Sequence, residues 1–185
     1  MRTAEPASGM VAEDSVKSGR RPMPQGPTRA TLRDLSWVTV QVTLLVALLV
    51  LPAGWPLPLL VPLRALGLFL GAGGLALTGV AAWQLRLRRS LTPLPSPRAN
   101  AELQTAGLYR YARHPVYSGL LIWAGGIAIA AASGWHFLLF GILWAFFTAK
   151  ATHEERLLTQ KFSDYAAYAA RTPRFFPRPR RLPRS

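Results

Sequence analysis

Three long stretches without a charged residue constrain this chain more than any other feature of its sequence. They run over residues 35–63, 65–85 and 115–149. A helix needs about 20 apolar residues to cross a hydrocarbon core of roughly 30 Å. Because these stretches occupy much of a chain of 185 residues, the sequence predicts an integral membrane protein. We therefore expect an all-α fold with four or five transmembrane helices.

The boundaries of the predicted helices follow from prolines, glycines and length. The first span is predicted over Leu35–Leu51 and the second over about Leu63–Leu85. Between them we expect a proline-rich loop whose last proline, Pro62, interrupts helical structure just before the second span. The last stretch is too long for one crossing, because its 35 residues would extend about 52 Å as a helix. Ser133-Gly134 is a natural turn. We therefore expect a hairpin of two helices, over residues 115–132 and 135–150.

The fourth predicted helix continues beyond the apolar stretch as an amphipathic segment. Its apolar side chains recur at steps of three and four residues, at Leu157, Leu158, Phe162, Tyr165 and Tyr168. This spacing is typical of one helix face. We expect an amphipathic cytoplasmic C-terminal helix that runs toward Pro173, with its two tyrosines packed on the apolar face.

Basic residues are distributed unevenly around the predicted spans. The net charge is +14, and the counts of Lys and Arg before, between and after the four spans are six, one, six, zero and nine. Cytoplasmic segments carry the excess of Lys and Arg, so we expect a multi-pass protein with both termini in the cytoplasm. Because the basic residues flank apolar spans, they favour contact with anionic lipid headgroups over nucleic acid.

A dense polar cluster lies where the third span begins. Residues 107–119 read Gly-Leu-Tyr-Arg-Tyr-Ala-Arg-His-Pro-Val-Tyr-Ser-Gly. Proline is favoured in the first turn of a helix, so Pro115 predicts a helix start there. The charge counts place this cluster on the same side of the membrane as Glu154 and Glu155. Arginine forks bind anions, carboxylates hold ammonium groups or hydroxyls, and tyrosine faces hold cations or aromatic rings. Together they suit a zwitterionic, cationic, aromatic ligand.

The pattern G-x-Y-x-x-x-R-H-P-x-Y-x-G over Gly107–Gly119 resembles the signature of the isoprenylcysteine carboxyl methyltransferase and phospholipid methyltransferase family. The C-terminal part is similar to a second motif of that family, at Glu154-Glu155, Leu158, Phe162, Tyr165, Tyr168, Arg171, Pro173-Arg174 and Pro177. The resemblance covers about residues 85–177. It implies an integral membrane methyltransferase that uses S-adenosylmethionine and acts on a lipophilic acceptor reached from the bilayer.

The resemblance also implies which residues form the site. Those expected to bind the cofactor are Gly107, Leu108, Tyr109, Arg113, His114, Pro115, Tyr117, Glu154 and Glu155. Those expected to be catalytic are Glu155, Arg171 and Arg174. The two arginines are expected to lie near a polar or anionic group of the acceptor. The chain then divides into a disordered basic tail (1–33), two transmembrane helices (34–86), a methyltransferase core (87–177) and a basic tail (178–185).

Each motif also has a plainer interpretation. Arg113-His114-Pro115 reads as a basic turn flanking a membrane span, Glu154-Glu155 as a solvated helix turn, and Arg171 and Arg174 as contacts to lipid headgroups. The alternative function is a non-catalytic membrane scaffold or binding protein that retains the family fold. A transporter is disfavoured, because no ionisable residue is expected in the middle of a span.

Composition limits two further aspects of function. The chain has no cysteine and three histidines without a recognisable metal spacing, so we expect no metal site. The residues do not identify the methyl acceptor. A prenylated cysteine, a phospholipid amine, a small thiol and another lipophilic acid all stay open.

Overall fold

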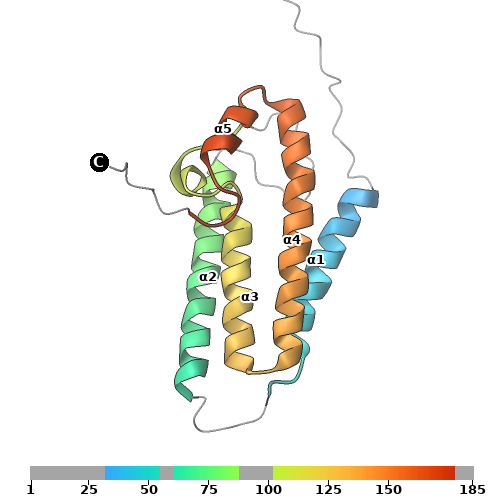
Figure 1. The fold of residues 1–185 in the computed structure, drawn as a ribbon, viewed down its shortest axis with the longest axis vertical. Coiled ribbons are helices and arrows are strands. Elements are labelled where there is room, and N and C mark those ends of the chain that lie inside the picture. Colours follow the sequence, from blue (N-terminus) through green and yellow to red (C-terminus); the bar gives the residue numbers. More distant parts are fainter. Residues whose placement is uncertain (1–31, 55–60, 88–101, 178–185) are drawn as a thin grey trace, which may run out of the picture.

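The computed structural model describes residues 32–54, 61–87 and 102–177, which form a helical bundle without strands in these ranges (Figure 1). In chain order the elements are α1 (Leu32–Val50), α2 (Val61–Leu87), the short 3-10 helix η2 (Gly107–Arg110), α3 (Pro115–Ala131), α4 (Gly134–Lys161) and α5 (Tyr165–Arg171). The predicted all-α class is therefore confirmed for the described residues. Most of both predicted tails, and much of the loop between α2 and α3, lie outside them.

The four long helices lie side by side, in the order α2, α3, α4 and α1 (Figure 1). The helix α5, η2 and the segment that follows α5 lie together at one end of the bundle. The core between α1, α3 and α4 is apolar, with Leu48, Leu121, Leu143 and Phe147 almost fully buried. The bundle thus holds the polar elements at one end and apolar side chains along its length.

Two helices, α2 and α4, are long and apolar enough to cross a membrane, while α1 and α3 are shorter apolar helices. Large apolar side chains face outward on α2, where Phe69 is 76% exposed and Trp83 is 61% exposed. Exposed apolar surface of this extent is typical of lipid contact rather than of a soluble monomer. A count of four or five spans, and the side of the membrane on which the termini lie, stay predictions.

The observed helices lie close to the predicted ones, with two local differences. The first helix begins at Leu32, so residues 32 and 33 are helical and not part of a tail. The sequence predicts that Pro62 breaks the chain before the second span, but this proline lies in the first turn of α2. A proline is tolerated there because the amide hydrogen that it lacks has no partner within the helix.

The prediction that the fourth helix runs on toward Pro173 is wrong. α4 ends at Lys161, the backbone at Phe162 is extended with φ −119° and ψ 116°, and α5 begins at Tyr165. The interruption falls on Ser163-Asp164, residue types that favour helix ends over helix interiors. The resulting turn brings α5 back over the bundle, where Tyr165 and Tyr168 are buried, as expected for packing residues.

The close contact of α2 with α3 depends on glycines, as the Gly67/Gly71 spacing indicates. A Cβ atom at Gly67 would lie 2.5 Å from the backbone oxygen of Gly126 on α3. We expect Gly67→Ala to push the two helices apart and to lower thermal stability in detergent by several degrees. Gly73→Ala is the matched control on the same helix, because nothing lies within 4 Å of a Cβ there. Equal melting temperatures for the two variants would contradict this packing.

Candidate functional site

The first half of the predicted site is fixed onto α2 by η2. The backbone N–H of Leu108 donates to Gln84 Oε1 at 3.0 Å, and the hydroxyl of the buried Tyr109 donates to the carbonyl of Ala81 at 3.3 Å. Gly107 has φ +64°, and a Cβ there would lie 2.6 Å from Gln84 Oε1. Glycine meets both requirements, so the conformation of this turn accounts for the first residue of the signature.

The segment after α5 binds directly to the start of α3. The backbone N–H groups of Arg113 and His114 donate to the carbonyls of Pro173 and Arg174, at 2.9 and 3.0 Å. The hydroxyl of Ser118 donates to the carbonyl of Phe175 at 2.5 Å. These bonds bring the two sequence motifs together at one end of the bundle, although the bonded residues lie 57 to 60 positions apart in the sequence.

Glu155 lies at the centre of the joined motifs, with 14% of its side chain exposed. Arg174 donates to both of its oxygens, from Nη2 at 2.7 Å and from Nε at 3.1 Å. Arg113 Nη2 lies 3.1 Å from Oε1, and His114 Nε2 lies at the same distance from that oxygen. A carboxylate with this many charged partners is held in one orientation, so Glu155 fixes the positions of two arginines and a histidine.

Glu154 faces the opposite edge of the His114 ring. His114 Nδ1 lies 3.5 Å from Glu154 Oε2, and the hydroxyl of Tyr117 donates to Glu154 Oε1. The rings of His114 and Tyr117 stack with centroids 5.4 Å apart and planes within 6° of parallel. One histidine therefore bridges two consecutive carboxylates. We call Arg113, His114, Tyr117, Glu154, Glu155 and Arg174 the carboxylate network.

The tyrosines around this network stay neutral. Burial raises the pKa of Tyr168 to about 12 and raises those of Tyr109 and Tyr165 further. The hydrogen bonds with Glu155 raise the pKa of Arg174 above its already high usual value. The Tyr168 hydroxyl donates to the carbonyl of Tyr109 at 2.6 Å, which joins α5 to η2. At neutral pH Tyr109 and Tyr168 act as hydroxyl donors and the arginine acts as a fixed cation.

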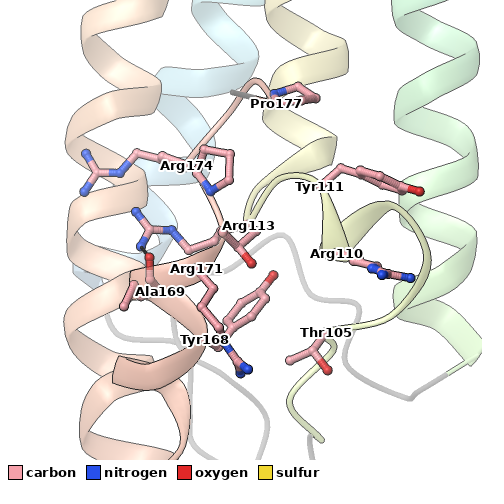
Figure 2. A pocket seen from close by; sticks show the side chains of 12 residues that line it. Thr105, Arg110, Tyr111, Arg113, Tyr168, Ala169, Arg171, Arg174 and Pro177 are labelled. Atoms are coloured by element: carbon pink, nitrogen blue, oxygen red, sulfur yellow. Dashed lines mark hydrogen bonds between the residues drawn. The ribbon is translucent and has the colours of Figure 1, made fainter. Parts of the chain in front are cut away.

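A pocket of about 1320 Å³ opens beside the network (Figure 2). Among the residues that the structure describes, its lining includes four arginines, namely Arg110, Arg113, Arg171 and Arg174, and no carboxylate. The pocket is formed by the loop around η2, by α5 and by the segment after α5. Such a lining favours an anionic group over a cationic one.

The structure brings most of the predicted site residues together. The carboxylate network contains six of them, Pro115 begins α3, and Gly107, Leu108 and Tyr109 hold the preceding turn on α2. Arg171 lies apart from the network: it lines the pocket, and its Nε donates to the carbonyl of Ala167 at 3.1 Å. The interpretation of Glu154-Glu155 as a solvated turn is wrong, because both side chains are about 15% exposed and bonded to partners on other elements. The catalytic and cofactor-binding roles stay predictions.

Sequence reasoning missed several residues that build this end of the bundle. Gln84 anchors the turn at Gly107, Ser118 binds the segment after α5, and Lys150 lies 1% exposed with its Nζ 5.4 Å from the centroid of the Tyr117 ring. A lysine that closes a charge-free stretch is a signal that could have identified the last of these. Glutamine and serine are common polar residue types, so Gln84 and Ser118 gave no such signal.

A sequence profile of the phospholipid methyltransferase family matches residues 63–165, more than half of the chain. The chain belongs to the phospholipid methyltransferase family. The match spans α2, the signature at η2 and α3, and the two glutamates of α4. Together with the two helices long enough to cross a bilayer, family membership identifies a membrane protein.

Named relatives of this family member fall into two groups. A protein-S-isoprenylcysteine O-methyltransferase of Schizosaccharomyces pombe is 40% identical over 77 residues, 40% of this chain and 33% of the relative. Protein-S-isoprenylcysteine O-methyltransferase B of Arabidopsis thaliana is 38% identical over 74 residues, 39% of this chain and 38% of the relative. The cobalt-zinc-cadmium resistance protein CzcN of Cupriavidus metallidurans is 34% identical over 131 residues, 67% of this chain and 52% of the relative.

The matched region thus spans between a third and about half of the length of these relatives. In the part of the chain that the structure describes, no three histidine, aspartate or glutamate side chains group in a way that could hold a metal ion. Because the matched region covers only part of these relatives, the activity of this chain is a proposal, which rests on its family and on the geometry of the carboxylate network.

Proposed function

We propose that this chain is a membrane methyltransferase that uses S-adenosylmethionine and methylates a lipophilic acceptor bearing an anionic group. The observation that most supports the proposal is the carboxylate network. His114 and Tyr117 from the first motif bind Glu154 and Glu155 from the second, and these four residues lie in the family-matched region. We further propose that residues 87–177 form the methyltransferase core.

The residues at this end of the bundle fit the proposed methyl donor. S-adenosylmethionine supplies an electrophilic methyl group on a positively charged sulfur. Glu154 provides a carboxylate for a cationic group or for hydroxyls, and the stacked rings of His114 and Tyr117 hold this carboxylate in place. The turn at Gly107–Tyr109 would supply backbone groups to the same ligand.

The different partners of Glu155 and Glu154 support different roles for the two side chains. Both oxygens of Glu155 already accept bonds from arginine, so this side chain is better suited to hold Arg113, His114 and Arg174 in place than to accept a proton. Glu154 has a neutral hydroxyl and one histidine nitrogen as its nearest partners. It is the carboxylate of the pair that remains more available to a ligand.

The four-arginine pocket is the proposed site for the anionic group of the acceptor. Arg171 and Arg110 are exposed in it, whereas Arg113 and Arg174 are bonded to Glu155. Orienting the acceptor this way beside the donor site would supply proximity, which accounts for much of the catalysis of a simple methyl transfer. A carboxylate or thiolate acceptor needs no general base, which agrees with the pairing of Glu155.

Calorimetric titration of the purified protein in detergent with S-adenosylmethionine tests the proposal. We expect the wild-type protein to bind, and His114→Ala to weaken binding by roughly tenfold or more, because the two carboxylates lose their common partner. His153→Ala is the matched control: that ring stacks on Trp37, with centroids 5.9 Å apart, and is not part of the network.

The outcomes separate the enzyme from the alternative of a non-catalytic scaffold. Folded wild-type protein that binds no methyl donor would overturn the proposal. Binding without transfer to any lipid or metabolite, when membranes are incubated with isotopically labelled donor, would favour a binding protein. A labelled product that depends on His114 would identify the acceptor and establish the activity.

A further inference from the structure

Tyr165 carries a buried hydroxyl that takes no part in the carboxylate network. This tyrosine is the first residue of α5 and is 2% exposed, and its hydroxyl has no hydrogen-bond partner among the described residues. The other three buried tyrosines, Tyr109, Tyr117 and Tyr168, each donate their hydroxyl to a carbonyl or a carboxylate. A buried hydroxyl without an acceptor costs free energy that a phenylalanine would not. A ligand that accepts a hydrogen bond would remove this cost.

Charged groups of the network surround Tyr165. Arg113 links α4 to α5, because its Nη2 lies 3.1 Å from Glu155 Oε1 and its Nη1 donates to the carbonyl of Ala169 at 3.0 Å. Ala169 lies four residues after Tyr165, so the two residues share one face of α5. Tyr165 interacts electrostatically with Glu155, Arg113 and Arg174. Both oxygens of Glu155 already bind these arginines, so this carboxylate holds the cations and leaves the tyrosine hydroxyl unbonded.

The four-arginine pocket extends to the same group of side chains. Its lining includes Arg113, Arg174 and Tyr168, and the Tyr168 ring packs edge-on against that of Tyr165, with centroids 5.9 Å apart. The Nε of Arg113 is also buried without a hydrogen-bond partner in the part of the chain that the structure describes. A tyrosine hydroxyl and a guanidinium Nε are both donors, so a group that satisfies either of them offers acceptor oxygens. Beside two arginines, such a group is favoured when it is anionic.

Tyr165 is suited to donate to an anion. Burial and the neighbouring charge of Glu155 raise the pKa of its hydroxyl well above the usual value. The hydroxyl therefore keeps its proton at neutral pH and brings no negative charge of its own. A neutral donor next to fixed cations binds an anionic oxygen without repelling it.

We propose that the Tyr165 hydroxyl is a ligand-binding group, which donates a hydrogen bond to a carboxylate held beside Arg113 and Arg174. This inference rests on the proposed function and adds to it a residue whose ring packs α5 on the bundle while its hydroxyl binds a ligand. The carboxylate can belong to the methionine part of the methyl donor or to a lipophilic acceptor. The two sources share one chemistry, and the experiment distinguishes them.

The test compares wild type with Tyr165→Phe by calorimetry in detergent, using ligands with and without a carboxylate. The donor pair is S-adenosylmethionine and its decarboxylated analogue, and the acceptor pair is N-acetyl-S-farnesylcysteine and its methyl ester. For the pair whose carboxylate is bound, Tyr165→Phe should weaken binding of the carboxylate form by roughly tenfold. Its affinity for the form without a carboxylate should stay within about twofold of wild type. The pair that shows this difference identifies the source.

Thermal unfolding of the ligand-free protein separates ligand binding from packing. Tyr168→Phe is the matched control, because it removes a hydroxyl that is bonded to the carbonyl of Tyr109. We expect Tyr168→Phe to lower the melting temperature, and Tyr165→Phe to keep or raise it, since this variant removes an unpaired polar group. A clearly lower melting temperature in Tyr165→Phe would show a bond within the protein and overturn the inference.

The binding data can overturn the inference in two further ways. One is that Tyr165→Phe keeps wild-type affinity for every carboxylate ligand that wild type binds. The other is that it loses affinity equally for both members of a pair, because the hydroxyl would then not act on the carboxylate. Folded wild-type protein that binds no S-adenosylmethionine would instead overturn the proposed function.

Discussion

Replacing Glu155 by alanine is expected to cause the largest loss of methyl-donor binding of any single substitution in this protein. The variant removes the common partner of Arg113, Arg174 and His114 and leaves the two guanidinium charges without their carboxylate. Breaking a buried ion pair by removing one partner costs about 3–5 kcal/mol. We expect the free energy of unfolding in detergent to fall by about 3 kcal/mol and donor binding to weaken by about 100-fold or more.

Two comparisons make the Glu155 prediction specific. Asp164→Ala removes an exposed carboxylate in the turn before α5 and should leave donor binding unchanged. Glu155→Gln keeps acceptor capacity without the charge, so its affinity should fall between those of wild type and Glu155→Ala. Calorimetry for binding and thermal unfolding for stability report the two effects separately. Full donor affinity in folded Glu155→Ala would show that the carboxylate network is structural only.

The helical fold was largely predictable from this sequence because charge-free length is a direct consequence of the bilayer. Residues 65–85 and the turn at Ser133-Gly134 located α2 and the α3–α4 hairpin closely. The break at Ser163-Asp164 was missed because apolar residues recur at helical spacing on both sides of it. The low helix propensities of two residues are a weak signal against that spacing. The fold there is decided by the burial of Tyr165 and Tyr168 against other elements.

The site was predictable in its residues more than in its geometry. The charge counts indicated that Gly107–Gly119 and Glu154-Glu155 face the same end of the bundle, and the structure places them in contact. No local pattern could show that the backbone of Pro173 and Arg174 binds that of Arg113 and His114, because such bonds leave no trace in residue type. The pairing of Gln41 with Lys150 depends on how α1 packs on α4, which is equally invisible in a single sequence.

Arg174 and Arg171 share one expected role in the sequence, and their surroundings in the structure separate them. Arg174 binds both oxygens of Glu155 and is 30% exposed. Arg171 is exposed on α5 and faces the pocket. The first arginine is therefore part of the carboxylate network, and the second is free to meet an anionic ligand in the pocket. Their substitutions should affect different kinetic parameters.

Arg174→Ala is expected to weaken binding of the methyl donor by roughly tenfold, because Glu155 loses two charge-assisted hydrogen bonds. Arg171→Ala should leave donor affinity within about twofold of wild type and raise the KM for an anionic acceptor by about tenfold, since an exposed arginine contributes through the ligand alone. Calorimetry with the donor and initial rates at varied acceptor concentration measure the two quantities. Glu155 contacts the side chain of Arg174 and lies apart from that of Arg171, so the two arginines are expected to act on different ligands. Loss of donor affinity in Arg171→Ala would contradict this expectation, and so would an effect of Arg174→Ala on the acceptor KM alone.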